Sequence, residues 1–145
     1  MTTYLPDVNV LVASVRSDHP HHVTARSFLW RSRQAGHSFV VPVEVLASAL
    51  RVLTLDIWIE SETSASARDL VNDWIRASSA EVVSHAPGSW RVLGEFARTL
   101  SLGTRAIPDA LLAASAIASR RTIVTFDRGF ARYPGLNAEI LKSSA

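Results

Sequence analysis

Four acidic residues occupy positions where a chain of alternating strands and helices would bring them together. Asp7 directly follows a short apolar segment of strand type, and Asp127 comes two residues after another. Glu44 and Asp109 lie in the first turns of two segments with helical spacing. Ligands of open α/β sheets collect at the carboxyl ends of the strands. We therefore expect these four carboxylates to converge on one edge of a sheet.

Carboxylates that converge need a proton or a cation between them. Two of them about 4 Å apart repel by roughly 4 kcal/mol at an effective dielectric constant of about 20. A shared proton or a bound divalent cation relieves that repulsion. The chain has no cysteine, so an all-oxygen site favours Mg²⁺ or Mn²⁺ over zinc.

Each acid also has a plainer interpretation. Asp7 suits the N-cap of a helix, and Asp127 suits a turn before Gly129. Asp109 and Glu44 would each stabilise a helix dipole by about 0.3–1 kcal/mol. The apolar neighbours of Asp7 and Asp109 favour a site, because an unpaired carboxylate in such surroundings is costly.

The elements that would position these acids alternate along the chain. The predicted strands cover residues 4–6, 39–41, 81–84 and 122–125, with a weaker one at 138–141. The predicted helices cover residues 7–13, 18–36 with Asp18 as cap, 42–53, 70–75, 90–102 and 109–121, and residues 60–67 suit a loop. This alternation predicts one α/β domain over residues 1–145, with a mainly parallel sheet of four to five strands flanked by helices.

The composition narrows the class of protein. The net charge is +2, and of the 15 basic residues all but Lys142 are arginine, which suits phosphate recognition or reflects arginine-rich codon usage. The lack of cysteine excludes disulfides and thiolate zinc sites. No segment is long and apolar enough to span a bilayer, and the N-terminus lacks the basic region of a signal peptide. We expect a cytoplasmic protein with no membrane contact, although export by another route stays open.

Four segments around the acids resemble the acidic motifs of PIN-domain nucleases, most closely those of VapC-type toxins from bacterial toxin–antitoxin pairs. They are residues 7–11 (DVNVL), 42–45 (PVEV), 108–114 (PDALLAA) and 125–130 (TFDRGF). Residues 18–22 and 132–136 also resemble segments common in that group. Each motif is weak alone, but all four occur in order, and the likeness extends from residue 4 to about residue 141.

The resemblance implies a three-layer PIN-like fold and a catalytic metal site. Asp7, Glu44, Asp109 and Asp127 would be the catalytic, metal-binding acids, with Asp7 and Asp109 as the most direct ligands. Asn9 and Thr125 would orient the carboxylates. The implied cofactor is Mg²⁺, with Mn²⁺ as a substitute.

The resemblance also implies an activity and partners. The chain would cleave RNA endonucleolytically with a metal-activated water, which Asp127 or Glu44 could orient. A small antitoxin of the VapB kind would inhibit it and bind DNA through its other end, and the toxin would form homodimers. Arg105 and Arg128 are candidate phosphate contacts, and each also suits an ordinary surface charge.

Other classes of protein fit less well. A receiver domain would place a lysine after its last strand, whereas Lys142 lies in the tail. A phosphohydrolase with an aspartyl nucleophile would need an aspartate where Asn9 stands. A PIN-like module that only sequesters its antitoxin and regulates the operon, without significant nuclease activity, stays open.

Histidines and the middle of the chain remain without an assigned role. The spacing of His19, His21 and His22 does not suit a helical metal-binding pair, and His85 has no identifiable partner. Residues 55–84 match no motif, and this variable region is a candidate for the choice of RNA target.

Overall fold

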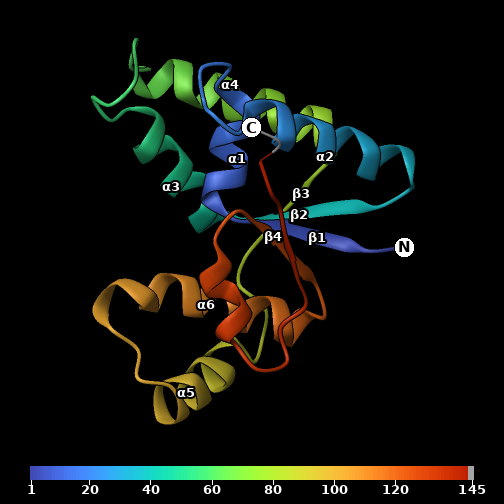
Figure 1. Ribbon diagram of the computed structural model, residues 1–145, viewed down its shortest axis with the longest axis vertical. Helices are drawn as coiled ribbons and strands as arrows, with labels where there is room; N and C mark the ends of the chain where they lie inside the picture. The colour runs from blue at the N-terminus through green and yellow to red at the C-terminus, as the bar shows by residue number, and fades with distance from the viewer. Residues whose placement is uncertain (144–145) are drawn as a thin grey trace.

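A sheet of five parallel strands forms the centre of the computed structural model, which describes residues 1–143 (Figure 1). The strands are β1 (Thr3–Pro6), β2 (Ser38–Pro42), β3 (Glu81–Val83), β4 (Thr122–Thr125) and β5 (Ala138–Ile140), in the spatial order β3-β2-β1-β4-β5. Tyr4 of β1 is in register with Phe39 of β2 on one side and with Thr122 of β4 on the other. The predicted parallel α/β sheet is confirmed.

Helices cover both faces of this sheet. They are α1 (Val8–Val15), α2 (His22–Gln34), α3 (Val43–Leu53), α4 (Ser64–Ser78), α5 (Ser89–Thr99) and α6 (Ile107–Ser119). In Figure 1, α1 to α4 lie on one side of the sheet, and α5 and α6 lie on the other. This three-layer arrangement is the predicted one. No helix within residues 1–143 has the length and apolar character needed to cross a membrane.

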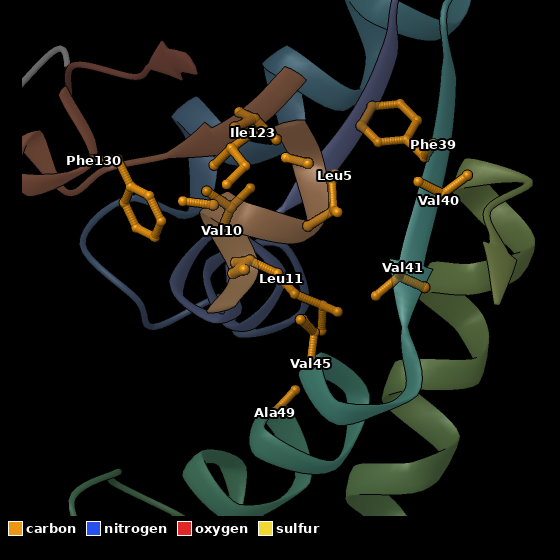
Figure 2. Close-up of a cluster of buried hydrophobic side chains, with 14 of the residues drawn as sticks. Leu5, Val10, Leu11, Phe39, Val40, Val41, Val45, Ala49, Ile123 and Phe130 are labelled. Atoms are coloured by element: carbon orange, nitrogen blue, oxygen red, sulfur yellow. The ribbon is translucent and has the colours of Figure 1, made fainter. Parts of the chain in front are cut away.

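The core forms where β1 and β4 meet α1. Leu5, Leu11 and Ile123 are fully buried, and Figure 2 shows them in one cluster with Val10 and Val41. Strands covered on both faces need apolar residues at successive positions, which explains the short runs of β-branched residues. Burial of each such side chain stabilises the fold by about 1.5–3 kcal/mol.

The order of the strands creates a crevice at one end of the sheet. From β1 the chain proceeds to β2 and β3 on one side, whereas β4 and β5 lie on the other side of β1. The direction of winding therefore reverses between β1 and β4, and such a reversal is where open α/β sheets bind ligands. Asp7 follows β1 and Asp127 follows β4, so both acids lie at this point.

The second predicted helix begins later than its sequence indicates. We expected a start near Asp18 with that residue as cap, but α2 begins at His22 and Asp18 caps nothing. The carboxylate of Asp18 instead pairs with the guanidinium of Arg16, at 2.6 Å. Arg16 is a buried arginine, and a buried charge needs a partner more than a helix needs that cap.

The expected loop at 60–67 is also partly wrong, because α4 begins at Ser64. A reciprocal capping box starts this helix: the Thr63 hydroxyl accepts from the Ser66 amide, and the Ser66 hydroxyl accepts from the Thr63 amide. The serine-rich composition that suggested a loop is what caps the helix.

Candidate functional site

Asp7 links the end of β1 to the start of α1. Its amide donates to the Val124 carbonyl at 2.9 Å. One carboxylate oxygen accepts from the Val8 amide at 2.7 Å, and the other accepts from the Thr125 hydroxyl at 2.9 Å. Only 6% of the residue is exposed. Asp7 is thus both the N-cap of α1 and a carboxylate held in one orientation.

Thr125 joins Asp7 to Asp127. It is completely buried at the end of β4, and its hydroxyl donates to Asp7 while accepting from the Asp127 amide at 3.0 Å. Asp127 in turn accepts from the Gly129 amide at 2.8 Å. A Cβ at position 129 would lie 3.0 Å from the Asp127 carboxylate, which explains the glycine in this turn.

Asp109 faces these two acids from the other layer of the fold. It lies in the first turn of α6 and is half-buried. Burial, together with the negative charges of Asp7 and Asp127, raises the pKa of Asp109 to about 6. Burial also raises the pKa of Asp7, against the hydrogen bonds from Thr125 and Val8, and Asp127 adds to the rise. The charges of Asp7 and Asp127 therefore disfavour ionisation of Asp109, and the charge of Asp127 disfavours that of Asp7.

Within residues 1–143, no basic side chain lies within ion-pair distance of these carboxylates. None of the ion pairs in that part of the chain involves Asp7, Asp109 or Asp127. Carboxylates close enough to shift each other's pKa, with no arginine or lysine between them, need a proton or a cation to become stable.

Glu44 lies at the rim of a hollow that Asp7 and Asp109 also line. It is in the first turn of α3 with 59% of its side chain exposed, and its carboxylate is 3.6 Å from Nε2 of His85. A hollow of about 120 Å³ is lined by Glu44, His85, Asp7 and Asp109, with Leu111 and Leu112 among its apolar walls. No partner for His85 is identifiable from the sequence, because the pairing of β3 beside β2 is what brings its loop to α3.

The donor set fits a hard divalent cation chemically. Its groups are carboxylates without thiolates, the kind that Mg²⁺ and Mn²⁺ prefer. In the conformation shown, no three His, Asp or Glu side chains of residues 1–143 are grouped closely enough to hold one ion. The Asp109 carboxylate makes no hydrogen bond in that part of the chain, so no such bond holds it away from Asp7. Asp7 and Asp109 are the residues that would hold the ion.

The remaining predicted site residues have different surroundings. Thr125 contacts Asp7 as expected, whereas the Asn9 side chain is exposed on α1 and makes no hydrogen bond to an acid in the described chain. Arg105, in the short 3₁₀ turn Thr104–Ala106, and Arg128, beside Asp127, are exposed. The structure therefore brings together Asp7, Thr125, Asp109 and Asp127, adds Glu44 at the rim, and within residues 1–143 shows no hydrogen bond from the Asn9 side chain to these acids.

Comparison with known proteins places these observations in a family. The PIN domain family matches residues 4–136. Ribonuclease VapC31 from Mycobacterium tuberculosis (strain H37Rv) is 32% identical over 90% of this chain and 92% of its own length, and ribonuclease VapC25 from the same strain is 33% identical over 90% and 92%. Among solved structures, VapBC2 from Rickettsia felis bound to a promoter DNA fragment has a TM-score of 0.71 at 19% identity, over 97% of this chain and 100% of that one. VapC20 from M. tuberculosis, described as a sarcin–ricin loop cleaving toxin, has a TM-score of 0.67 at 15% identity, over 92% and 98%. At these identities the two structures show a shared fold.

Proposed function

Because this chain belongs to the PIN domain family and, within it, to the group of the VapC ribonucleases, we propose that it is a toxin that cleaves RNA with the help of Mg²⁺. One observation carries the proposal: Asp7, Asp109 and Asp127 lie together at the switch point of the sheet, and none of them takes part in an ion pair within residues 1–143. Such a group is unstable by itself and becomes stable with a divalent cation.

In this proposal the side chains divide the work by their surroundings. Asp7 and Asp109 hold the ion, since Asp7 is fixed by two hydrogen bonds and, within residues 1–143, no hydrogen bond holds the Asp109 carboxylate away from it. Thr125 fixes the orientation of Asp7. Asp127 and Glu44 lie further out, where a carboxylate can accept a hydrogen bond from an attacking water.

The metal would supply two effects when bound: it lowers the pKa of a water and it stabilises charge on a phosphate oxygen. The chain supplies the positions. The exposed Arg128 and Arg105 are the candidate contacts to neighbouring phosphates. Attack on phosphorus in line with the leaving 3′ oxygen would leave a 5′-phosphate and a 3′-hydroxyl.

The proposal includes protein partners. Several similar structures are complexes of VapC with VapB, and two contain DNA. We propose a small antitoxin of that kind, which inhibits the nuclease and binds DNA itself, and a homodimer of the toxin. A site of uncompensated carboxylates suits an inhibitor that presents a basic side chain to it.

The test is cleavage of a structured RNA by the purified chain, in Mg²⁺ and after chelation of the metal. Wild-type protein should cleave with Mg²⁺, fail after chelation and recover when Mg²⁺ or Mn²⁺ is returned. Asp109→Asn should lose more than about 100-fold, because even residues that only orient metal ligands are worth about 10–100-fold. Sequencing of the new 5′ ends would identify the RNA and the site.

A matched control is Asp73→Asn, which removes an acid whose exposed carboxylate pairs with Arg76 on the surface of α4. It should cleave like wild type. RNA cleavage that persists without divalent metal, or equally in Asp109→Asn, contradicts the proposed site. A chain that binds its antitoxin but cleaves no RNA would instead be the regulatory module considered above.

A further inference from the structure

Among the four predicted metal-binding acids, Glu44 is the one whose side chain is held least by its own helix. It is the second residue of α3, and its side chain is mostly exposed. Its carboxylate accepts no hydrogen bond in the described chain, and His85 is its one ion-pair partner there. A glutamate with several rotatable bonds at a helix surface samples many positions, so something else must direct it to the hollow.

His85 is held in a position from which it can direct the Glu44 carboxylate toward the hollow. Only 18% of its side chain is exposed. The next residue, Ala86, donates its amide to the buried hydroxyl of Ser115 in α6 at 3.3 Å, and its carbonyl accepts from the Ser89 hydroxyl at 2.6 Å. The loop that carries His85 is therefore attached to the helix that carries Asp109.

The imidazole thus connects two walls of the hollow. The adjacent Ala86 amide is anchored to α6, Nε2 of His85 lies 3.6 Å from Glu44 of α3, and the same hollow contains Asp7 and Asp109. Nδ1 of His85 is buried without a hydrogen-bond partner in the described residues, and buried polar atoms without a partner are uncommon in native proteins.

From this geometry we propose that His85 is a positioning residue, which holds the Glu44 carboxylate over the hollow so that Glu44 joins Asp7 and Asp109 around the metal. The inference rests on the proposed metal-dependent function and deepens it. The role needs an N–H that donates to Glu44, and it acts through Glu44 rather than on the RNA.

The test measures Mn²⁺ binding by titration calorimetry and by the electron paramagnetic resonance of the free ion. His85→Ala should weaken Mn²⁺ binding about 10-fold, in the range for residues that orient metal ligands. Glu44→Gln should weaken it by a similar or larger factor. The double variant should bind like Glu44→Gln alone, because His85 acts through Glu44. His85→Gln retains a donor of similar reach and should recover most of the affinity.

RNA cleavage adds a second measurement. His85→Ala should lower kcat about 10-fold and leave KM for RNA within a factor of about two, because it contacts no substrate. His37→Ala is the matched control, since His37 accepts from the Thr2 amide, distant from the four acids, and it should match wild type. Melting temperatures must show that His85→Ala is folded, and if it is not, His85→Gln against His85→Met makes the same comparison.

Three results would overturn the proposal: losses from His85→Ala and Glu44→Gln that multiply in the double variant, unchanged Mn²⁺ affinity in His85→Ala, or no Mn²⁺ binding by wild type. The last would overturn the proposed metal site as well. Normal, coupled Mn²⁺ binding in a protein that cleaves no RNA would refute the proposed ribonuclease and leave the role of His85 intact.

Discussion

The two ends of α1 gather acidic residues in opposite ways. At its start, Asp7 lies near Asp109 and Asp127, and none of the three forms an ion pair in the part of the chain that the structure describes. At its end, the C-cap residue Arg16 lies among carboxylates of the nearby loops. The helix has eight residues. One short element therefore has carboxylates that repel one another at its start and carboxylates that pair with an arginine at its end.

Arg16 satisfies almost every donor it has. Its guanidinium donates to Asp18 at 2.8 and 2.6 Å, to the Glu60 carbonyl at 2.8 Å and to Glu62 at 3.3 Å. It also lies over the ring of Trp58, 4.7 Å from its centre. The hydrogen bond from Arg16 lowers the pKa of Asp18, whereas burial and like charges raise that of Asp109. Acidic residues gather at both ends, but the described ion pairs neutralise only the group around Arg16.

The largest expected contrast comes from the same substitution at both ends. Asp7→Asn should lower RNA cleavage more than about 100-fold, while Asp18→Asn should change activity per folded molecule by less than about threefold. Asp7→Asn removes a buried like charge but keeps an acceptor for only one of the two donors, Val8 and Thr125, so its melting temperature should change little. Mg²⁺-dependent cleavage and thermal unfolding, measured on both variants, check this pair. Equal activities would remove the distinction.

Loss of the compensating cation should affect stability rather than chemistry. Arg16→Leu leaves Asp18 and Glu62 without their partner and removes the contact with Trp58. The free energy of unfolding should fall by about 1–3 kcal/mol, as measured by urea denaturation. Cleavage per folded molecule should stay near wild type at low temperature. A large loss of activity in a folded Arg16→Leu protein would connect the two ends functionally.

A smaller effect is expected from the hydroxyl that holds Asp7. Thr125→Val conserves the shape of a fully buried side chain but removes the donor to Asp7 and the acceptor for the Asp127 amide. Cleavage should fall about 10-fold, mainly in kcat, with Thr125→Ser intermediate. If Thr125→Val cleaves at the wild-type rate, the orientation of Asp7 does not depend on this bond.

The smallest effect is a difference in pH dependence. The pKa of Asp109 rises from 3.8 to about 6 on folding, so its protonated form favours the folded state. That contribution is complete below pH 3.8 and is lost as the pH rises through about 6. Asp109→Asn should therefore be more stable than wild type at pH 7 in chelator, by at most about 1 kcal/mol for a half-exposed group, and the difference should vanish near pH 4.

The other end of α1 should respond in the opposite sense. The pKa of Asp18 is lowered, so its contribution to stability is present above its unfolded pKa and is lost as the pH falls through the folded value. Urea titrations of wild type, Asp109→Asn and Asp18→Asn across pH 3–8 would separate the two. A gain in stability for Asp109→Asn that persists unchanged at pH 4 would show that the repulsion is not its cause.

The elements near the site could be read from the sequence because local chemistry specified them. Residues Thr122–Thr125 form the predicted strand, since a β-branched run between a helix and a turn has few alternatives. The convergence of Asp7, Asp109 and Asp127 also followed from the rule for parallel sheets. Their roles as ligands remain predictions, because geometry alone does not show a bound ion.

Contacts between distant segments could not be read in this way. Arg16 and Glu62 are far apart in sequence and pair only after α3 and α4 have packed on α1. His85 meets Glu44 for the same reason. A cap such as Asp18 is assigned from its immediate neighbours, and that assignment fails when a buried charge at a distance competes for it.

The attachment of the α3–α4 connection has a consequence for how the protein can evolve. Arg16 binds the Glu60 carbonyl and the Trp58 indole donates to the Val52 carbonyl at 3.0 Å, while Ile57 and Ile59, on either side of Trp58, are exposed. Substitutions at exposed positions usually change stability by no more than about 0.5 kcal/mol. Mutations can therefore accumulate at Ile57 and Ile59 while the bonded Trp58 is kept, so related chains can diverge in this loop without altering the carboxylates at the other end of α1.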